Sequence, residues 1–206
     1  MKIASISENL TIEKRIAITP EIAKKYISLG IEVSLPENYA GHLGLNDEKY
    51  KEFGVSIFKD ENEIVKNADV IVQLGLLDND KISLLKEKQT FIGVLNPYDN
   101  KDKINNLVEK GVNTFSLELL PRITRAQSMD ILSSQANLAG YKAVVESFAN
   151  FEKAIPMMMT AAGTIPAAKV LVVGAGVAGL QAIATAKRMG AIVFATDVRM
   201  ASKEQV

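Results

Sequence analysis

Three glycines late in the chain have the spacing of a phosphate-binding turn. Gly174, Gly176 and Gly179 form a G-x-G-x-x-G pattern. In such a pattern the first glycine permits a tight turn, the second lets the backbone approach a pyrophosphate, and the third lets a helix pack closely on a strand. The N-terminus of that helix offers free N–H groups and a partial positive charge to the phosphates. The spacing predicts a dinucleotide site that includes Gly174, Ala175, Gly176, Val177, Ala178 and Gly179.

An aspartate follows at the distance expected for ribose recognition. Asp197 lies 23 positions after Gly174, and a carboxylate there can accept hydrogen bonds from both hydroxyls of an adenosine ribose. It also repels a 2′-phosphate, which favours NAD(H) over NADP(H). Arg199 weakens this preference a little, because a nearby arginine can accommodate a 2′-phosphate. We assign Asp197, Val198 and Arg199 to the expected cofactor site.

The segment around these residues has the order of a nucleotide-binding βαβ unit. A strand is expected at Val170–Val173, a helix at Val177–Met189 and a second strand at Ile192–Ala195. Two alternatives stay open: a glycine-rich packing site without a ligand, and an FAD site. Because only part of a doubly wound domain precedes Val206, we expect a fragment, a truncated reading frame, or half of a domain completed by a partner.

Apolar and amphipathic segments alternate in the first two thirds of the chain. Strands are expected at Lys2–Ile6, Ile31–Leu35, Asp69–Leu74, Thr90–Leu95 and Val112–Leu117. Helices are expected from Pro20 to near Gly30 and at Asp47–Phe53, Asp60–Lys66, Ser83–Lys88 and Lys101–Lys110. This alternation predicts a parallel sheet with helices on its faces.

A longer helix is expected from Ala126 to about Phe151, because this stretch has no proline and a single glycine. An apolar loop at Ala154–Thr164 follows it. We therefore predict an α/β protein with three parts. A Rossmann-like parallel-sheet domain occupies 1–125, a connecting helix 126–151, and an incomplete doubly wound dinucleotide-binding domain 152–206.

The composition excludes several other kinds of site. The 206 residues include 24 basic and 24 acidic side chains, so no basic surface for nucleic acid is expected. The absence of cysteine excludes disulfides and thiolate metal sites, and His42 is the single histidine, so no metal site is expected. The N-terminus lacks the apolar core of a signal peptide. The uncharged run Val170–Ala186 is glycine-rich and short of a spanning length, so we expect a cytoplasmic protein without a transmembrane segment.

Two stretches resemble one family. The first is Ser7–Leu35 (SENLTIEKRIAITPEIAKKYISLGIEVSL), which resembles the opening of the N-terminal domain of alanine dehydrogenases and transhydrogenases. The second is Pro121–Glu146 (PRITRAQSMDILSSQANLAGYKAVVE), which is similar to the transhydrogenase version, where alanine dehydrogenases differ. Together with the glycine motif and Asp197, the resemblance covers essentially the whole chain.

The resemblance implies a specific activity. In proton-translocating transhydrogenases this domain binds NAD(H) and passes hydride directly to NADP(H) held on a separate domain, while a membrane part couples the transfer to proton movement. It thus implies NADP(H)-binding and membrane-spanning partner subunits, a homodimer of this component, and a place on the inner face of the membrane through those partners. It also implies that Arg122 and Asp130 lie near the nicotinamide carboxamide and ribose and that Gln127 lies where the two nucleotides meet, with Ser133 at the matching position.

The same loop also fits a structural role. Thr124-x-x-Gln127 matches a capping box at the start of the long helix, and Arg122 and Asp130 could form an ion pair there. The residue types are compatible with either role. Hydride transfer between nicotinamides exchanges no proton at carbon, so the protein supplies position and electrostatics rather than a general base. All three residue types can orient an amide: arginine donates hydrogen bonds, glutamine both donates and accepts them, and aspartate accepts them.

An amino-acid dehydrogenase of the alanine type is the main competing hypothesis. Oxidation of an amine needs a proton acceptor, and the resemblance implies a lysine at the end of one strand and a histidine at the end of the next. Here the lysine position is Gln73, and the histidine position falls near Leu95-Asn96. His42 lies in a different loop and is expected at the surface. A truncated, non-catalytic nucleotide-binding module is the third hypothesis.

Overall fold

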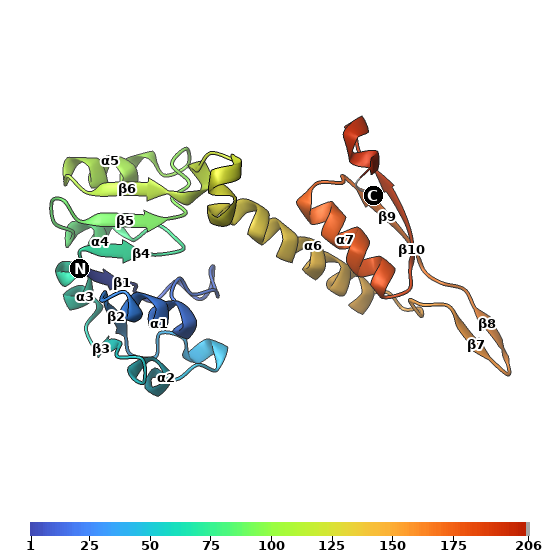
Figure 1. The fold of residues 1–206 in the computed structure, drawn as a ribbon, viewed down its shortest axis with the longest axis horizontal. Helices are drawn as coiled ribbons and strands as arrows, with labels where there is room; N and C mark the ends of the chain where they lie inside the picture. Colours follow the sequence, from blue (N-terminus) through green and yellow to red (C-terminus); the bar gives the residue numbers. More distant parts are fainter. Residues whose placement is uncertain (205–206) are drawn as a thin grey trace. The chain divides into compact units, whose positions relative to one another are not determined.

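The structure is a computed structural model that describes residues 1–204. The chain forms two compact units, of which the first is Met1–Met129 and the second begins at Asp130. Each unit has its own strands and helices (Figure 1).

The first unit is built on a six-stranded sheet with the strand order β3-β2-β1-β4-β5-β6. Every neighbouring pair is parallel, which confirms the predicted α/β class and parallel sheet. This is the order of a doubly wound sheet, whose winding reverses between β1 and β4. The strands are β1 (Lys2–Ala4), β2 (Glu32–Pro36), β3 (Ser56–Phe58), β4 (Val70–Val72), β5 (Thr90–Gly93) and β6 (Asn113–Ser116).

Helices cover both faces of this sheet. Successive side chains of a strand point to opposite faces, so Ile3 and Ala4 belong to two different core clusters. The Ile3 cluster includes buried residues of α1 and α2, and the Ala4 cluster includes buried residues of α3, α4 and α5. These helices are α1 (Pro20–Ser28), α2 (Asp47–Lys51), α3 (Glu61–Asn67), α4 (Asn79–Ser83) and α5 (Lys101–Glu109).

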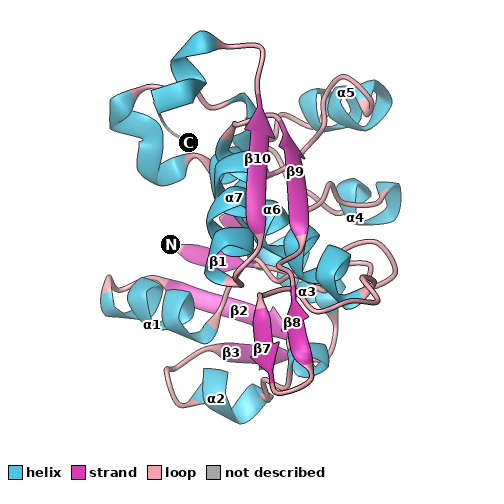
Figure 2. Ribbon diagram, turned by 90° about the vertical axis from the view of Figure 1, so that its right-hand side faces the viewer, coloured by secondary structure: helices cyan, strands magenta, loops and turns pink. Residues whose placement is uncertain are grey.

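The second unit contains the predicted βαβ unit. In it, β9 (Lys169–Val173) and β10 (Ile192–Thr196) run parallel (Figure 2), and α7 (Val177–Arg188) connects them. Val173 is opposite Thr196 in the register of the two strands. α7 packs along α6 (Ile131–Ala149). A Cβ added at Gly140 of α6 would overlap the backbone of Ala178, so this glycine allows the two helices to approach closely.

Two predicted helix starts are wrong. The helix expected at Ser83–Lys88 is α4 instead, because Asp78 takes the extended N-cap conformation before it and Ile82 is buried within it. The long helix begins at Ile131 rather than Ala126, since Thr124–Met129 forms a separate 3-10 helix, η3. Asp130 is the N-cap of α6 and accepts the N–H of Ser133, so the proposed capping box at Thr124 is wrong as well.

Three further strands were not predicted. The expected loop at Ala154–Thr164 contains most of an antiparallel hairpin, β7 (Met158–Thr160) and β8 (Gly163–Ile165), whose residues are all exposed. The short strand β3 was also missed. The remaining elements are the 3-10 helices η1 (Gly41–Leu43), η2 (Leu117–Leu119) and η4 (Met200–Glu204). Within residues 1–204, no helix combines the length and the apolar character needed to cross a membrane.

Candidate functional site

The turn between β9 and α7 gives each of its three glycines a distinct role. Gly174 has φ +98°, a conformation that favours glycine, and its N–H donates to the Thr196 carbonyl at 2.7 Å, which joins the turn to the end of β10. A Cβ added at Gly179 would overlap the Gly174 carbonyl oxygen, so only glycine lets α7 start this close to the strand. At Gly176 an added Cβ would meet no atom within 4 Å. The space that a side chain would take at Gly176 is open, so a ligand could approach the backbone there.

The N-terminus of α7 is a potential anion site. Gly176 is its N-cap and has an extended backbone, and within residues 1–204 no side chain caps this end. The first N–H groups of a helix have no partner in the helix itself, so here they are available to a phosphate. Val177 is exposed, whereas Ala175 is buried. The turn therefore presents backbone donors rather than side chains.

A pocket of about 340 Å³ adjoins this turn. It is lined by Ala175, by the end of β10 with Asp197, and by η4 with Ser202 and Lys203. This places the ribose-binding candidate beside the glycine turn, as the motif predicts. Sequence reasoning missed Ser202 and Lys203, because only the fold of η4 back over the turn brings them there.

Asp197 is strongly held in this pocket. Its Oδ2 accepts the Ala175 N–H at 2.7 Å, and its Oδ1 accepts the Arg199 N–H at 2.8 Å. The Arg199 side chain also donates to both oxygens, Nε to Oδ1 and Nη2 to Oδ2, each at 3.1 Å. The Arg199 guanidinium has the largest effect on the pKa of the Asp197 carboxyl, and the two N–H groups add to it. Together they hold this pKa well below its usual range. Val198, between them, is fully exposed.

Of the four residues expected near the nicotinamide, two form a hydrogen-bonded pair. The Ser133 N–H donates to Asp130 Oδ1 at 2.9 Å, and the Ser133 hydroxyl donates to Oδ2 at 2.7 Å, at the first turn of α6. Arg122 and Gln127 belong to the first unit. Arg122 precedes η3, Gln127 lies within it, and both are exposed.

The carboxyl edge of the first sheet, between β1 and β4, is where doubly wound proteins bind ligands. In this chain Gln73 is 3% exposed there. Its Oε1 accepts the Ser5 hydroxyl at 3.0 Å and the Ile6 N–H at 3.1 Å, and its Nε2 donates to the Ile6 carbonyl at 3.0 Å. The Tyr39 hydroxyl extends the network by donating to Ser5 Oγ at 2.9 Å. A neutral amide engaged by its own chain thus stands where a basic residue was expected of an amino-acid dehydrogenase.

The Glu8 carboxylate accepts hydrogen bonds from the backbone next to Gln73. Its Oε1 accepts the N–H groups of Leu74 at 2.7 Å and Gly75 at 3.4 Å. Burial raises the pKa of the Glu8 carboxyl, and these N–H groups oppose that rise. After β5, the N–H groups of Leu95 and Asn96 both donate to Glu118 Oε1. A carboxylate of the chain itself therefore accepts the backbone N–H groups at this edge as well.

His42 is exposed in η1, as expected. Its Nε2 lies 2.7 Å from the Lys14 carbonyl oxygen. Next along the chain from Lys14, Arg15 is paired with Glu13, Nη2 to Oε2 at 2.5 Å. The histidine therefore contacts the backbone of this N-terminal loop.

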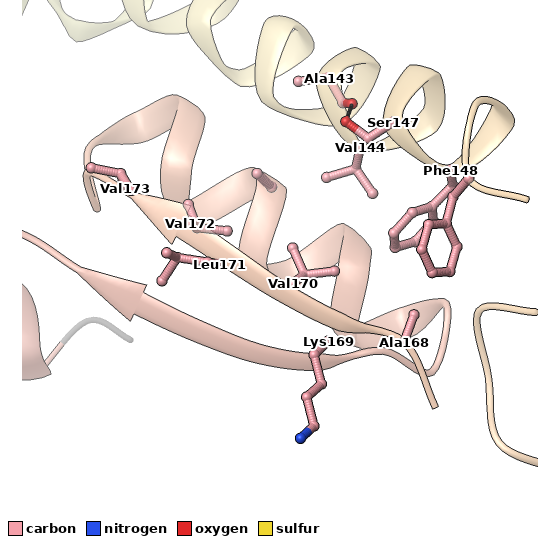
Figure 3. Close-up of a pocket in the computed structure, with 12 residues that line it drawn as sticks. Ala143, Val144, Ser147, Phe148, Ala168, Lys169, Val170, Leu171, Val172 and Val173 are labelled. Atoms are coloured by element: carbon pink, nitrogen blue, oxygen red, sulfur yellow. Dashed lines mark hydrogen bonds between the residues drawn. The ribbon is translucent and has the colours of Figure 1, made fainter. Parts of the chain in front are cut away.

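An apolar pocket of about 390 Å³ lies between α6 and β9 in the second unit. In Figure 3, Val144 and Phe148 of α6 are on one side and Val170 and Val172 of β9 are on the other. Lys169 brings a charged side chain to the lining, but this side chain points away from the pocket (Figure 3). We assign no chemistry to this pocket.

The chain matches two family models, described as alanine dehydrogenase/PNT N-terminal domain over residues 5–139 and C-terminal domain over residues 143–206. It is 48% identical over 210 residues to the first part of NAD(P) transhydrogenase subunit alpha from Rickettsia prowazekii (strain Madrid E). The protein of the same description from Rhodospirillum rubrum is 46% identical over 211 residues. Both alignments cover 100% of this chain and 55% of the relative, so the chain spans about half the length of these relatives.

The solved structures give the same result. The transhydrogenase from Sinorhizobium meliloti matches with a TM-score of 0.93 and 47% identity, covering 99% of this chain and 61% of that chain. The two family models together account for nearly every residue, in the same order as the two units of the fold. The chain therefore belongs to the alanine dehydrogenase/PNT family.

Proposed function

We propose that this chain is the NAD(H)-binding part of a transhydrogenase, which transfers hydride between NADH and NADP⁺ coupled to proton translocation by partner membrane subunits. The relatives described above are transhydrogenase alpha subunits, and the second unit contains a dinucleotide-type turn. Their greater length supports the existence of partner domains or subunits.

The observation that carries the proposal is the open approach to the N-terminus of α7. A Cβ at Gly176 would point into empty space, although the glycines on either side of it in the motif are required by the backbone itself. Packing within the chain therefore does not explain why this position is glycine, whereas a pyrophosphate lying against its backbone does. The helix N-terminus behind it stabilises negative charge. We assign Gly174, Ala175, Gly176, Val177, Ala178 and Gly179 to the pyrophosphate.

We assign the adenosine ribose to Asp197, with Val198 and Arg199 beside it. The carboxylate lies next to the glycine turn and opens into a pocket. Two ribose hydroxyls can donate to it, whereas a 2′-phosphate would face a negative charge. The proposal is therefore that this chain binds NAD(H) and that NADP(H) is bound by a partner.

We assign the nicotinamide to Arg122, Gln127, Asp130 and Ser133 by family resemblance. When bound, the cofactor supplies the hydride at its nicotinamide ring. The chain has to hold that ring in place, and the Ser133 bonds fix the direction of the Asp130 carboxylate. Arg122 and Gln127 are exposed and thus accessible to a ligand. A role in position and electrostatics needs no general base.

The partners in this proposal are the NADP(H)-binding and membrane-spanning transhydrogenase subunits. We propose in addition that the component is a homodimer and lies in the cytoplasm on the inner face of the membrane through these subunits. An amino-acid dehydrogenase is disfavoured, because Gln73 is neutral and makes three hydrogen bonds within its own chain.

Isotope transfer tests the function. The 206-residue chain would be mixed with a purified NADP(H)-binding transhydrogenase component, with NADH deuterated at C4 and NADP⁺. We expect label in NADPH only when both proteins are present, and less of it with Asp197→Asn. Asp102→Asn, which changes an exposed aspartate of α5, is the charge-matched control. Reduction of NAD⁺ by alanine without the partner, or no transfer with it, would contradict the proposal.

A further inference from the structure

Arg199 uses the acceptor positions that the proposed ribose needs. A carboxylate offers about four lone-pair positions, and Asp197 accepts four hydrogen bonds in this structure. Two come from backbone N–H groups, those of Ala175 and Arg199 itself. The other two come from Nε and Nη2 of the Arg199 side chain, one on each oxygen. The carboxylate is therefore saturated within the chain.

A ligand can displace the side-chain donors of Asp197 more readily than its backbone donors. The backbone donors are fixed by the glycine turn and by the turn after β10. The guanidinium is held at the end of a flexible side chain that is 60% exposed, whereas the Asp197 side chain is 10% exposed. Two ribose hydroxyls need one acceptor position on each carboxylate oxygen of Asp197. The guanidinium of Arg199 uses these same positions, with Nε on Oδ1 and Nη2 on Oδ2. The Arg199 side chain is thus the group that has to leave.

We infer that Arg199 is an internal competitor of the adenosine ribose at Asp197, which lowers the affinity for NAD(H) and weakens its discrimination from NADP(H). This inference rests on the proposed NAD(H) site. Competition follows because ribose and guanidinium cannot both use the same lone pairs. Weaker discrimination follows because the cation neutralises the carboxylate that would repel a 2′-phosphate. Lys203 in the lining of the same pocket adds a second positive charge to this region.

Nucleotide fluorescence on the full chain tests the inference. NADH and NADPH would be titrated into the wild type and Arg199→Ala. Because the Arg199 partner of this ion pair is solvent-exposed, its release corresponds to about a two- to fivefold change in an equilibrium. NADH should therefore bind Arg199→Ala about two- to fivefold more tightly. The ratio of NADPH to NADH dissociation constants should increase. This increase would not result from a general loosening of the fold.

Two further variants make the result specific. Arg188→Ala removes an exposed arginine at the far end of α7 and should leave both affinities unchanged. In an Asp197→Asn background, Arg199→Ala should no longer tighten NADH binding, because the ion pair is already gone. NADH binding that is unchanged or weaker in Arg199→Ala would refute the inference alone. No NADH binding by the wild type or any variant would refute the proposed function and the inference together.

Discussion

Alanine at two of the three motif glycines should affect different properties: stability at Gly179 and NADH affinity at Gly176. In Gly179→Ala, the new Cβ would lie well inside 3.0 Å of the Gly174 carbonyl oxygen, a backbone atom that no side-chain rotation can move away. The turn resists movement because the Gly174 N–H is bonded to Thr196 at 2.7 Å. In Gly176→Ala, the new Cβ meets nothing within 4 Å, and the backbone has a negative φ that alanine can adopt.

The expected magnitudes follow from these contacts. Overpacking costs about 1–3 kcal/mol, and the fixed backbone at Gly179 places this variant near the upper limit. Alanine gains about 1 kcal/mol over glycine inside a helix, so we expect Gly179→Ala to lose about 2 kcal/mol of unfolding free energy. At the N-cap, alanine is less favourable than glycine by about 0.5–1 kcal/mol. Gly176→Ala should therefore lose no more than about 1 kcal/mol of unfolding free energy. Its methyl group should instead hold the pyrophosphate away and weaken NADH binding about tenfold or more, equivalent to about 1.4 kcal/mol.

Urea unfolding followed by circular dichroism, together with NADH titration, measures both effects. We expect Gly176→Ala to remain nearly as stable as the wild type while it loses NADH affinity, and Gly179→Ala to lose stability. If Gly176→Ala binds NADH as tightly as the wild type, no pyrophosphate lies against that backbone.

Substitutions at three other residues test particular hydrogen bonds. Burial raises the pKa of Glu8, so the native state retains a proton that the unfolded chain loses, and wild-type stability should fall as the pH rises above 4.5 through the native pKa. Glu8→Gln keeps an oxygen for Leu74 and Gly75 and should flatten this part of the stability profile in urea titrations; an unchanged slope would contradict the assignment. Asp130→Ala removes the N-cap of α6 and should cost about 0.5–2 kcal/mol of unfolding free energy, whereas Asp130→Asn keeps an acceptor, so equal losses would argue against capping. Tyr50→Phe deletes the hydroxyl that donates to the buried Ile18 carbonyl at 2.9 Å and should cost about 1–3 kcal/mol; a loss too small to measure in thermal unfolding would mean that the carbonyl finds another partner.

The sheet of the first unit was predictable because its strands follow a simple pattern. Short apolar runs such as Val70–Val72 alternate with helices that begin at recognisable caps, and Thr19 and Pro20 start α1 as expected. The strands that were missed gave no comparable signal. None of the residues of β3 is buried, and the β7–β8 hairpin is exposed on both strands, so neither has the apolar pattern of a core strand.

The candidate site was predictable where it depends on local spacing. The glycine motif and Asp197 come together because one strand, one helix and the next strand fix their distance. The start of α6 was misplaced, because Thr124 and Asp130 are both good caps and the sequence alone does not rank them. The network of Gln73 was beyond prediction, since it joins residues about 67 positions apart. The same is true of the Arg199 side chain, whose position depends on rotamers rather than on sequence pattern.

NAD(H) binding by this chain is tested first by a titration of the 206-residue chain with NADH and, in parallel, NADPH, followed by nucleotide fluorescence. We expect micromolar binding of NADH, much weaker binding of NADPH, and loss of NADH affinity in Asp197→Ala. Binding of neither nucleotide, or tighter binding of NADPH than of NADH, would contradict this expectation.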